Sequence, residues 1–250
     1  MTATPASGGP LDGRVVAVTG AGRGLGLATV RVLLEHGARV VAHHRSPAPD
    51  LFQLVQAHGD RVHLAAGDVS DEDTARAVIA AAEQLGGLDV LVHNAAITRD
   101  ELLVRMPTEQ WDEVIRVNLR SAFLITKHAV RRMVRRRYGR LIYLSSLAAV
   151  IGSSGQSNYA ASKAALHGLS QSVAQEYARY NIRSVVLAPG LLDLGLGAAL
   201  PVEIQQRKLD HSLTGTISGA SVAHTIAFLA GPHADFINAT TVHINGGIAY

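Results

Sequence analysis

The chain contains no cysteine among its 250 residues, which excludes disulfides, thiolate zinc sites and a cysteine nucleophile. It also lacks any apolar run that approaches the roughly 18 residues needed to span a membrane. The opening segment MTATPASGGPLD has neither a basic start nor an apolar middle, so we expect a flexible tail over residues 1–10 rather than a signal peptide. These absences favour a cytoplasmic protein that does not enter a membrane.

Charge and aromatic residues are also sparse. Charged residues make up 17% of the chain and the net charge is +3, which is too small to indicate nucleic-acid binding. The basic run RRMVRRRYGR, residues 131–140, contains Tyr138 as its only aromatic residue for stacking on bases. The run is either a solvated helix end or a docking patch for an acidic partner. The histidines form no ligand pair of the HExxH kind, so we expect no metal site.

Short valine-rich runs alternate along the chain with segments of helical periodicity. Strands are expected at 14–20, 38–44, 61–66, 88–94, 139–146, 182–189 and 240–246. Helices are expected at 25–37, 50–58, 70–84, 108–137, 157–180 and 219–230, with a loop and a short helix over 190–210. Ser70 is the expected N-cap of the third helix, and Gly37 the stop of the first.

This alternation requires parallel βαβ units. The sequence therefore predicts an α/β fold, a single-domain Rossmann-type doubly wound parallel sheet of about seven strands with helices on both faces, over residues 11–250. Ligands of such sheets bind beyond the carboxyl ends of the strands, so the residues that follow the strands are the candidates for a site.

The segment TGAGRGLG follows the first strand and opens a helix, where Gly20, Gly24 and Gly26 let the backbone approach a pyrophosphate. The second strand ends in AHHRSP, without the acid that would bond a ribose 2′-hydroxyl. Arg45, together with Arg23, could clamp a 2′-phosphate instead. The alternative is that Arg45 is a surface residue and that the site does not discriminate between NADP and NAD. We expect NADP as the cofactor, with NAD possible.

The segment SNYAASKAAL places Tyr159 and Lys163 four residues apart, on one face of a helix. One interpretation is an amphipathic helix that shows its polar side to water. The other is a phenol whose pKa, ordinarily about 10, is lowered by the nearby ammonium so that it works as an acid.

The chain resembles the short-chain dehydrogenase/reductase family in TGAGRGLG, GDVSD, HNAA, VNL, the serines at 145 and 146, YAASK, LAPG and INGG, which occur in the family's order. It is most similar to 3-oxoacyl-acyl-carrier-protein reductases, through GRLIYLSSLAAVIGSSGQSNYAASKAALHGLSQS in particular.

The resemblance implies a catalytic set of Asn118, Ser146, Tyr159 and Lys163. Ser146, which matches the family's serine better than Ser145 does, would polarise a carbonyl that Tyr159 then protonates. Lys163 would lower the pKa of Tyr159 and bond the nicotinamide ribose, and Asn118 would hold a relay water through a distorted helix backbone.

The motifs and the resemblance together assign the cofactor contacts to Gly20, Arg23, Gly24, Leu25, Gly26, His44, Arg45, Ser46, Asp68, Val69, Asn94, Ala95, Tyr159, Lys163, Pro189, Gly190 and Leu192. Three residues depart from the family pattern. His93 and Ala96 replace Asn and Gly in HNAA, and Leu194 replaces a threonine that contacts the cofactor. The expected substrate loop at about 190–212 is unusually apolar, and is either a lid for a greasy substrate or a flexible loop.

The resemblance implies NADPH-dependent reduction of a 3-oxoacyl thioester, presented on an acidic acyl carrier protein, in fatty acid or polyketide synthesis. Arg136, Arg137 and Arg179 are the expected docking residues for the carrier. One alternative is a reductase or dehydrogenase of a free alcohol, sugar or cyclic ketone, and another is a non-catalytic dinucleotide-binding subunit. A homotetramer or homodimer is expected, with no nucleic-acid partner.

Overall fold

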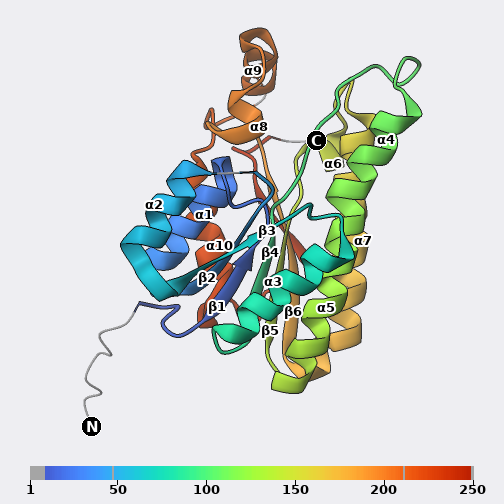
Figure 1. Cartoon of the computed structure of the whole chain (residues 1–250). Coiled ribbons are helices and arrows are strands. Elements are labelled where there is room, and N and C mark those ends of the chain that lie inside the picture. Colours follow the sequence, from blue (N-terminus) through green and yellow to red (C-terminus); the bar gives the residue numbers. More distant parts are fainter. Residues whose placement is uncertain (1–8, 47, 211, 249–250) are drawn as a thin grey trace.

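A computed structural model describes residues 9–46, 48–210 and 212–248, so most of the tail expected at 1–10 lies outside the described residues. These residues form seven strands in one sheet, all parallel, in the order β3-β2-β1-β4-β5-β6-β7 (Figure 1). The strands are β1 Val15–Val18, β2 Arg39–His44, β3 Val62–Ala66, β4 Val90–His93, β5 Gly139–Leu144, β6 Ile182–Pro189 and β7 Thr240–Ile244. The predicted α/β fold is confirmed.

Helices cover both faces of the sheet because its central strands are apolar on both sides. On one face lie α1 (Gly24–Glu35), α2 (Pro49–His58) and α10 (Gly219–Ala230), which pack on one apolar cluster. On the other lie α3 (Glu72–Gln84), α5 (Ser121–Arg136) and α7 (Ser157–Tyr177), which pack on a second cluster (Figure 1). Alternate residues of β1 belong to the two clusters, Val16 to the first and Ala17 to the second.

The long helix expected at 108–137 is interrupted. It consists of α4 (Thr108–Ile115), a π-helical turn at Arg116–Arg120 and α5, and Arg137 follows in the left-handed conformation with φ 52°. A π turn inserts an extra residue into the helical ladder, and such turns are frequent at functional sites. The turn contains Asn118, so it supplies the distorted backbone expected there.

The expected N-cap at Ser70 is wrong. Helix α3 begins at Glu72 with Asp71 as its N-cap, and the Ser70 hydroxyl donates to Asp68 Oδ1 at 2.6 Å instead. The carboxylate of Asp68 competes for the serine because it is a charged acceptor two residues away.

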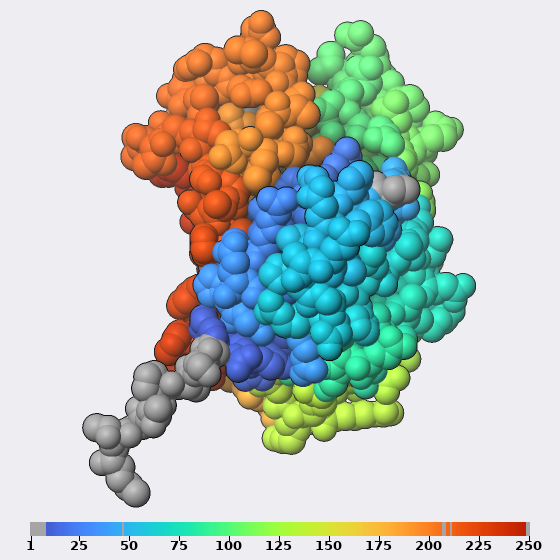
Figure 2. Space-filling model, turned by 60° about the vertical axis from the view of Figure 1, so that its left-hand side comes forward, coloured from blue at the N-terminus to red at the C-terminus, as the bar shows by residue number. Residues whose placement is uncertain are grey.

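Several short helices were not expected. They are α6 (Ala148–Ile151), after β5, and 3₁₀ turns at Gly59–Arg61 and Pro232–Ala234. A further 3₁₀ turn, Ala178–Tyr180, forms the end of the helix expected at 157–180. The loop after β6 contains α8 (Gly195–Ala198) and α9 (Val202–Leu209) rather than a single helix. Figures 1 and 2 show α8 and α9 and the chain that leads into α4 at the same end of the molecule, which is the end where the strands finish. Within the described ranges, no helix is long and apolar enough to cross a membrane.

Candidate active site

A cavity of about 1280 Å³ opens beyond the carboxyl ends of the strands. Every residue assigned to the cofactor from the sequence lines this cavity, as does Ser146. The predicted catalytic residue Asn118 does not line it, although its neighbour Val117 does. Parallel strands end at one edge, so residues distant in the sequence converge there.

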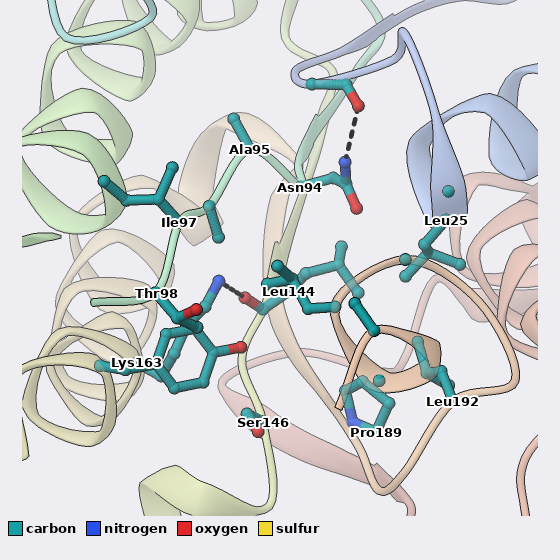
Figure 3. Close-up of a pocket in the computed structure, with 18 of the residues that line it drawn as sticks. Leu25, Asn94, Ala95, Ile97, Thr98, Leu144, Ser146, Lys163, Pro189 and Leu192 are labelled. Atoms are coloured by element: carbon teal, nitrogen blue, oxygen red, sulfur yellow. Dashed lines mark hydrogen bonds between the residues drawn. The ribbon is translucent and has the colours of Figure 1, made fainter. Parts of the chain in front are cut away.

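The glycine-rich turn after β1 is held by close packing and by hydrogen bonds. Gly20 has φ +66°, and a Cβ atom on Gly26 would lie 2.2 Å from the Gly20 carbonyl oxygen, so no larger residue fits. Asn94, which follows β4, donates from Nδ2 to Thr19 O at 2.9 Å and to Gly20 O at 3.2 Å, as Figure 3 shows in part. The turn therefore holds the amino end of α1 open toward the cavity, which suits a pyrophosphate.

The residues after β2 and β3 line the same end of the cavity. Arg45 and Arg23 are exposed at its rim. Asp68 accepts hydrogen bonds from the Ser70 amide and hydroxyl, and Arg116 lies 3.5 Å from its second oxygen. Burial alone would raise the pKa of Asp68, but these hydrogen bonds and the Arg116 guanidinium lower it overall. This end of the cavity thus offers two exposed cations and a hydrogen-bonded carboxylate to a ligand.

Tyr159 and Lys163 both point from α7 into the other part of the cavity. Lys163 is 1% exposed, and its Nζ donates to Leu144 O at 2.6 Å, which Figure 3 shows. The ammonium lies 5.7 Å from the centre of the Tyr159 ring. Ser146, which follows β5, lines the cavity beside Tyr159 and lowers the pKa of its phenol. The surface-helix interpretation of Tyr159 and Lys163 is therefore wrong, because both side chains face a cavity.

The two neighbouring serines have different surroundings. Ser145 is 4% exposed, and its Oγ lies 3.1 Å from Lys163 O and 2.8 Å from His167 Nε2. These contacts turn its hydroxyl into the protein, whereas Ser146 lines the cavity beside Tyr159. The geometry favours Ser146 over Ser145 as the residue that meets a ligand.

The expectation that Lys163 lowers the pKa of Tyr159 is wrong in this structure. Burial raises the pKa of Tyr159 to about 12, while the Ser146 side chain lowers it and the carboxylate of Asp100 raises it. Burial also lowers the pKa of Lys163 to about 7, so its positive charge is itself disfavoured. Tyr159 is therefore a protonated phenol at neutral pH, able to give a proton, and Lys163 is a group that exchanges protons near neutrality.

Asn118 has a structural position behind the cavity. Its Oδ1 accepts from Ile97 N at 2.9 Å, and its Nδ2 donates to Ile97 O and to Ser162 Oγ, both at 3.0 Å. The side chain is fully buried, and Ser162 in turn donates to Tyr159 O at 2.7 Å. Asn118 therefore joins the segment after β4 to the helix that carries Tyr159.

The residues that depart from the family pattern separate into two groups. His93 is fully buried, with its Nε2 3.0 Å from Ser121 Oγ, and burial lowers its pKa to about 3. It is a neutral residue of the protein interior. Ala96 and Leu194 line the cavity, and Leu194 also packs against the start of α10, where a Cβ atom on Gly219 would lie 2.0 Å from its Cδ2. Leu194 thus anchors the loop after β6 through apolar contact.

The far half of the cavity has an apolar wall that the sequence did not reveal as a whole. This wall is formed by Ile97, Leu147, Ile151, Leu196, Leu200 and Ile204. Ile151 on α6 and Leu196 on α8 are 50% and 43% exposed. Among described residues, the Asp, Lys and Arg side chains that line the cavity are Arg23, Arg45, Asp68 and Lys163, and none belongs to this wall. The apolar loop after β6 was the only signal for it in the sequence.

Gln156 is a further residue at the site that the sequence analysis missed. It lines the cavity just before α7, and its Nε2 donates to Asp100 Oδ2 at 2.9 Å. Asp100 is the carboxylate that acts on Tyr159, so Gln156 fixes a charge near the phenol. The only sequence signal was an amide immediately before the start of the SNYAASK motif.

The three arginines expected to dock a carrier differ in their contacts. Arg136 binds Gly86 O and the carboxylate of Asp89, so it is engaged within the chain. Arg137 donates to Arg179 O at 3.2 Å, and the guanidinium groups of both lie over the Tyr180 ring, at 5.9 and 4.9 Å from its centre. Arg137 and Arg179 are thus brought together around Tyr180, at the ends of α5 and α7 that lie away from the cavity (Figure 1).

Comparisons with known proteins agree with this architecture. The family model of short chain dehydrogenases matches residues 14–202. A 3-oxoacyl-[acyl-carrier-protein] reductase from Vibrio cholerae is 37% identical over 242 residues, which cover 95% of this chain and 98% of that protein. Nodulation protein G from Rhizobium sp. (strain N33) is 40% identical over 242 residues, which cover 96% of this chain and 98% of that protein.

A solved structure from Agrobacterium tumefaciens, of a protein proposed to be a gluconate dehydrogenase, superposes with a TM-score of 0.89 at 28% identity, covering 95% of this chain and 96% of that one. These relatives have different names, so the shared fold leaves the substrate open. The matches extend over nearly the whole chain and include the glycine turn and the Tyr159 helix. The chain therefore belongs to the short-chain dehydrogenase family, within which it resembles the 3-oxoacyl-[acyl-carrier-protein] reductases.

Proposed function

We propose that this protein is an NADPH-dependent reductase of 3-oxoacyl thioesters. The observation that carries the proposal is the division of the cavity into a basic end at Arg23 and Arg45 and an uncharged apolar end, with Ser146 and Tyr159 between them. The basic end suits a phosphorylated dinucleotide, and the apolar end suits an acyl chain.

The adenine and pyrophosphate half of the cofactor would be held by residues after the first four strands. Its nicotinamide half would lie beside Tyr159, Lys163 and the residues Pro189, Gly190 and Leu192. The glycine turn and the amino end of α1 would receive the pyrophosphate, and the loop at Asp68 and Val69 the adenine. Arg23 and Arg45 support NADP over NAD, because the sequence from His43 to Ser46 offers no carboxylate to a 2′-hydroxyl. When bound, the reduced nicotinamide supplies a hydride to the substrate carbonyl carbon.

The chain's own residues hydrogen-bond and protonate the carbonyl oxygen of the substrate. The Ser146 hydroxyl donates a hydrogen bond to it, which polarises the carbonyl. Tyr159 gives its proton to that oxygen as negative charge develops there, which its raised pKa permits because the phenol is fully protonated at neutral pH. Lys163, whose pKa of about 7 lies close to neutral pH, returns a proton to Tyr159. Asn118 fixes the backbone of the helix that carries both groups.

The apolar wall supports an acyl substrate over a sugar acid. A gluconate carboxylate and its hydroxyls would need charged or hydrogen-bonding partners, since buried polar groups without partners are costly. Leu147, Ile151 and Leu196 offer no such partners. Ser153, Ser154 and Gln156, which also line the cavity, carry no charge for the carboxylate. Two relatives named as 3-oxoacyl-[acyl-carrier-protein] reductases at 37% identity support the same substrate class.

We propose that an acidic acyl carrier docks at Arg137 and Arg179. Arg179 lies twenty positions beyond Tyr159, just past the end of α7, which at the rise of an α-helix is about 30 Å, and Arg137 at the end of α5 contacts it. A carrier docked there would serve the cavity of another copy of the chain more readily than the cavity of the same copy. The docking proposal therefore goes together with the proposed homodimer or homotetramer, and with a role in fatty acid or polyketide synthesis in the cytoplasm.

The purified protein should be mixed with NADPH or NADH and with 3-oxoacyl thioesters or a cyclic ketone, and separately with NADP⁺ or NAD⁺ and gluconate, and the absorbance of the reduced nicotinamide followed. We expect turnover with NADPH and 3-oxoacyl thioesters. Turnover on ketones or gluconate but not on thioesters would overturn the substrate, and binding of dinucleotide without any turnover would overturn the enzyme.

A second arm tests the carrier. The double variant Arg137→Ala with Arg179→Ala should raise KM for a carrier-linked thioester by about tenfold or more and leave KM for a small thioester analogue unchanged. Arg132→Ala, which removes an exposed arginine of the same helix, is the matched control. Equal effects on both substrates would contradict the docking site.

A further inference from the structure

His43 connects the ends of three neighbouring strands. It is the penultimate residue of β2, and its side chain is buried, with 2% exposed. Its Nδ1 accepts a hydrogen bond from the Gly20 amide at 3.2 Å, and its Nε2 lies 3.1 Å from the Gly67 carbonyl oxygen. An amide N–H can only donate and a carbonyl can only accept, so these two partners select the neutral ring with its proton on Nε2.

These contacts reach the turn that faces the dinucleotide end of the cavity. Gly20 begins the glycine-rich turn after β1, and Gly67 begins the loop after β3, with φ +66° and +146°. The His43 carbonyl also accepts from the Ala21 amide at 2.7 Å. One residue thus holds two successive amides of the glycine turn, while its ring fixes the loop that leads to Asp68.

We propose that His43 is a positioning residue for dinucleotide binding, which holds the glycine turn and the loop after β3 in their binding geometry only while its ring is neutral. A protonated imidazole has two N–H donors and no acceptor. Its Nδ1–H would then face the Gly20 N–H, and the turn would lose its support. Dinucleotide affinity should therefore fall in acid.

The charged and titratable groups that face His43 must be separated from its own titration. They are His44 on the same strand, Asp68 after β3 and His93 on β4. Asp68 stays ionised through mildly acid pH because its pKa is lowered, and His93 stays neutral because its pKa is about 3. The charge of His44 acts on His43, so His44 requires its own variant.

The direction of the pH effect follows from the burial of the ring. Burial lowers the pKa of His43 from its ordinary value of 6.5, against the opposing hydrogen bond to Gly67 O, and the charge of His44 lowers it further while that of Asp68 raises it. The binding-competent neutral form is present above the pKa and is lost as pH falls through it. Below that point the dissociation constant should rise by up to about tenfold per pH unit.

The test is the dissociation constant of NADPH between about pH 5 and pH 8, followed by energy transfer from Trp111, the single tryptophan of the sequence. His43→Gln supplies the same acceptor and donor without titrating. It should bind like the native protein at pH 8 and lose the acid weakening. His43→Leu removes both bonds and should bind about tenfold more weakly at pH 8. The control His44→Gln should keep the acid weakening.

A 2′-phosphate titrates near pH 6, so the native protein and His43→Gln are compared at each pH and the series is repeated with NADH. Identical pH profiles for these two proteins, or tight binding by His43→Leu, would overturn the proposal. Stronger binding of NADH than NADPH would refute the proposed cofactor but leave the His43 difference measurable with NADH. If the variants do not fold, ¹⁵N NMR of the native ring decides, since a proton on Nδ1 would also overturn the proposal.

Discussion

At the scale of single residues, burial rather than charge pairing sets the protonation states of Tyr159 and Lys163. Both groups lose water, so the phenol keeps its proton and the amine holds its proton only weakly. A protonated phenol next to a lysine that titrates near neutrality is arranged to deliver a proton to a carbonyl oxygen. These protonation states suit the proposed reduction near neutral pH.

Tyr159→Phe removes the proposed proton donor and keeps the ring in place. We expect kcat for reduction to fall by about 10² to 10⁴, because a positioned general acid contributes that much to the rate. The dissociation constant of NADPH should change little, since the hydroxyl acts on the substrate oxygen. Steady-state kinetics and a binding titration measure the two quantities, and a loss of binding equal to the loss of rate would contradict the assigned role.

The pH dependence of reduction should follow Lys163. Its lowered pKa means that the ammonium, the form that returns a proton, is present below a pH of about 7 and is lost above it. We expect kcat for reduction to fall as pH rises through about 7, while Tyr159 stays protonated to about 12. Lys163→Arg keeps a positive charge at all these pH values. Its pH–rate profile should lack the limb near 7, and an unchanged limb would assign it to another group.

At the scale of elements, the π turn between α4 and α5 sets the position of α7, which carries Tyr159. Asn118 in this turn bonds both backbone groups of Ile97 and the hydroxyl of Ser162. Three elements are thus held by one buried amide: the segment after β4, the turn and α7. The position of Tyr159 thus depends on Asn118, which lies behind the cavity and does not line it.

Asn118→Ala leaves the Ile97 N–H and carbonyl without their partners in a buried site. We expect a loss of about 3 kcal/mol in the free energy of unfolding, at about 1 kcal/mol for each of the three hydrogen bonds. Ser162→Ala removes one of them together with its bond to Tyr159 O and should cost less. Urea unfolding of both variants gives the comparison. A larger loss for Ser162→Ala would show that Asn118 is not the centre of this network.

At the scale of the whole molecule, one end of the sheet forms the cavity and the other carries contacts that stabilise the fold. The carboxyl ends of the strands form the cavity, and the opposite edge is held by arginines. Arg140, at the start of β5, is 2% exposed, bonds Asn181 O at 3.1 Å and the carboxylate of Asp235, and lies 4.4 Å from the Tyr138 ring centre. Part of the basic run thus serves stability.

Arg140→Met should destabilise the protein without changing its catalysis. The ion pair is half-open to water because Asp235 is 46% exposed, so we expect about 2 kcal/mol, below the range for fully buried pairs. Arg132→Met changes an exposed arginine of the same run and should cost less than about 0.5 kcal/mol. Urea unfolding measures both, with kcat and KM as the check that the cavity is intact. Equal stabilities would contradict the structural role of Arg140.

The sequence by itself determined the fold class and most of the residues at the cavity. Strand and helix periods are local patterns, and parallel strands bring their carboxyl ends to one edge, so the glycine turn, Ser146, Tyr159 and Lys163 could be placed together from spacing and family resemblance. The sequence also indicated a distortion at Asn118. These predictions succeeded because each rests on neighbours in the chain or on the topology of a parallel sheet.

The tertiary structure decided what depends on distant partners. The pKa of Tyr159 moved opposite to the expectation because burial is a property of the whole fold. Ser70 bonds Asp68 instead of capping α3, and Arg136 binds Asp89 across 47 positions. In the sequence, His43 is one of several residues of an apolar strand. Only the fold brings Gly20, after β1, and Gly67, after β3, to its two ring nitrogens. Desolvation and hydrogen bonding are set by atoms that the chain brings together only on folding, so spacing alone could not supply them.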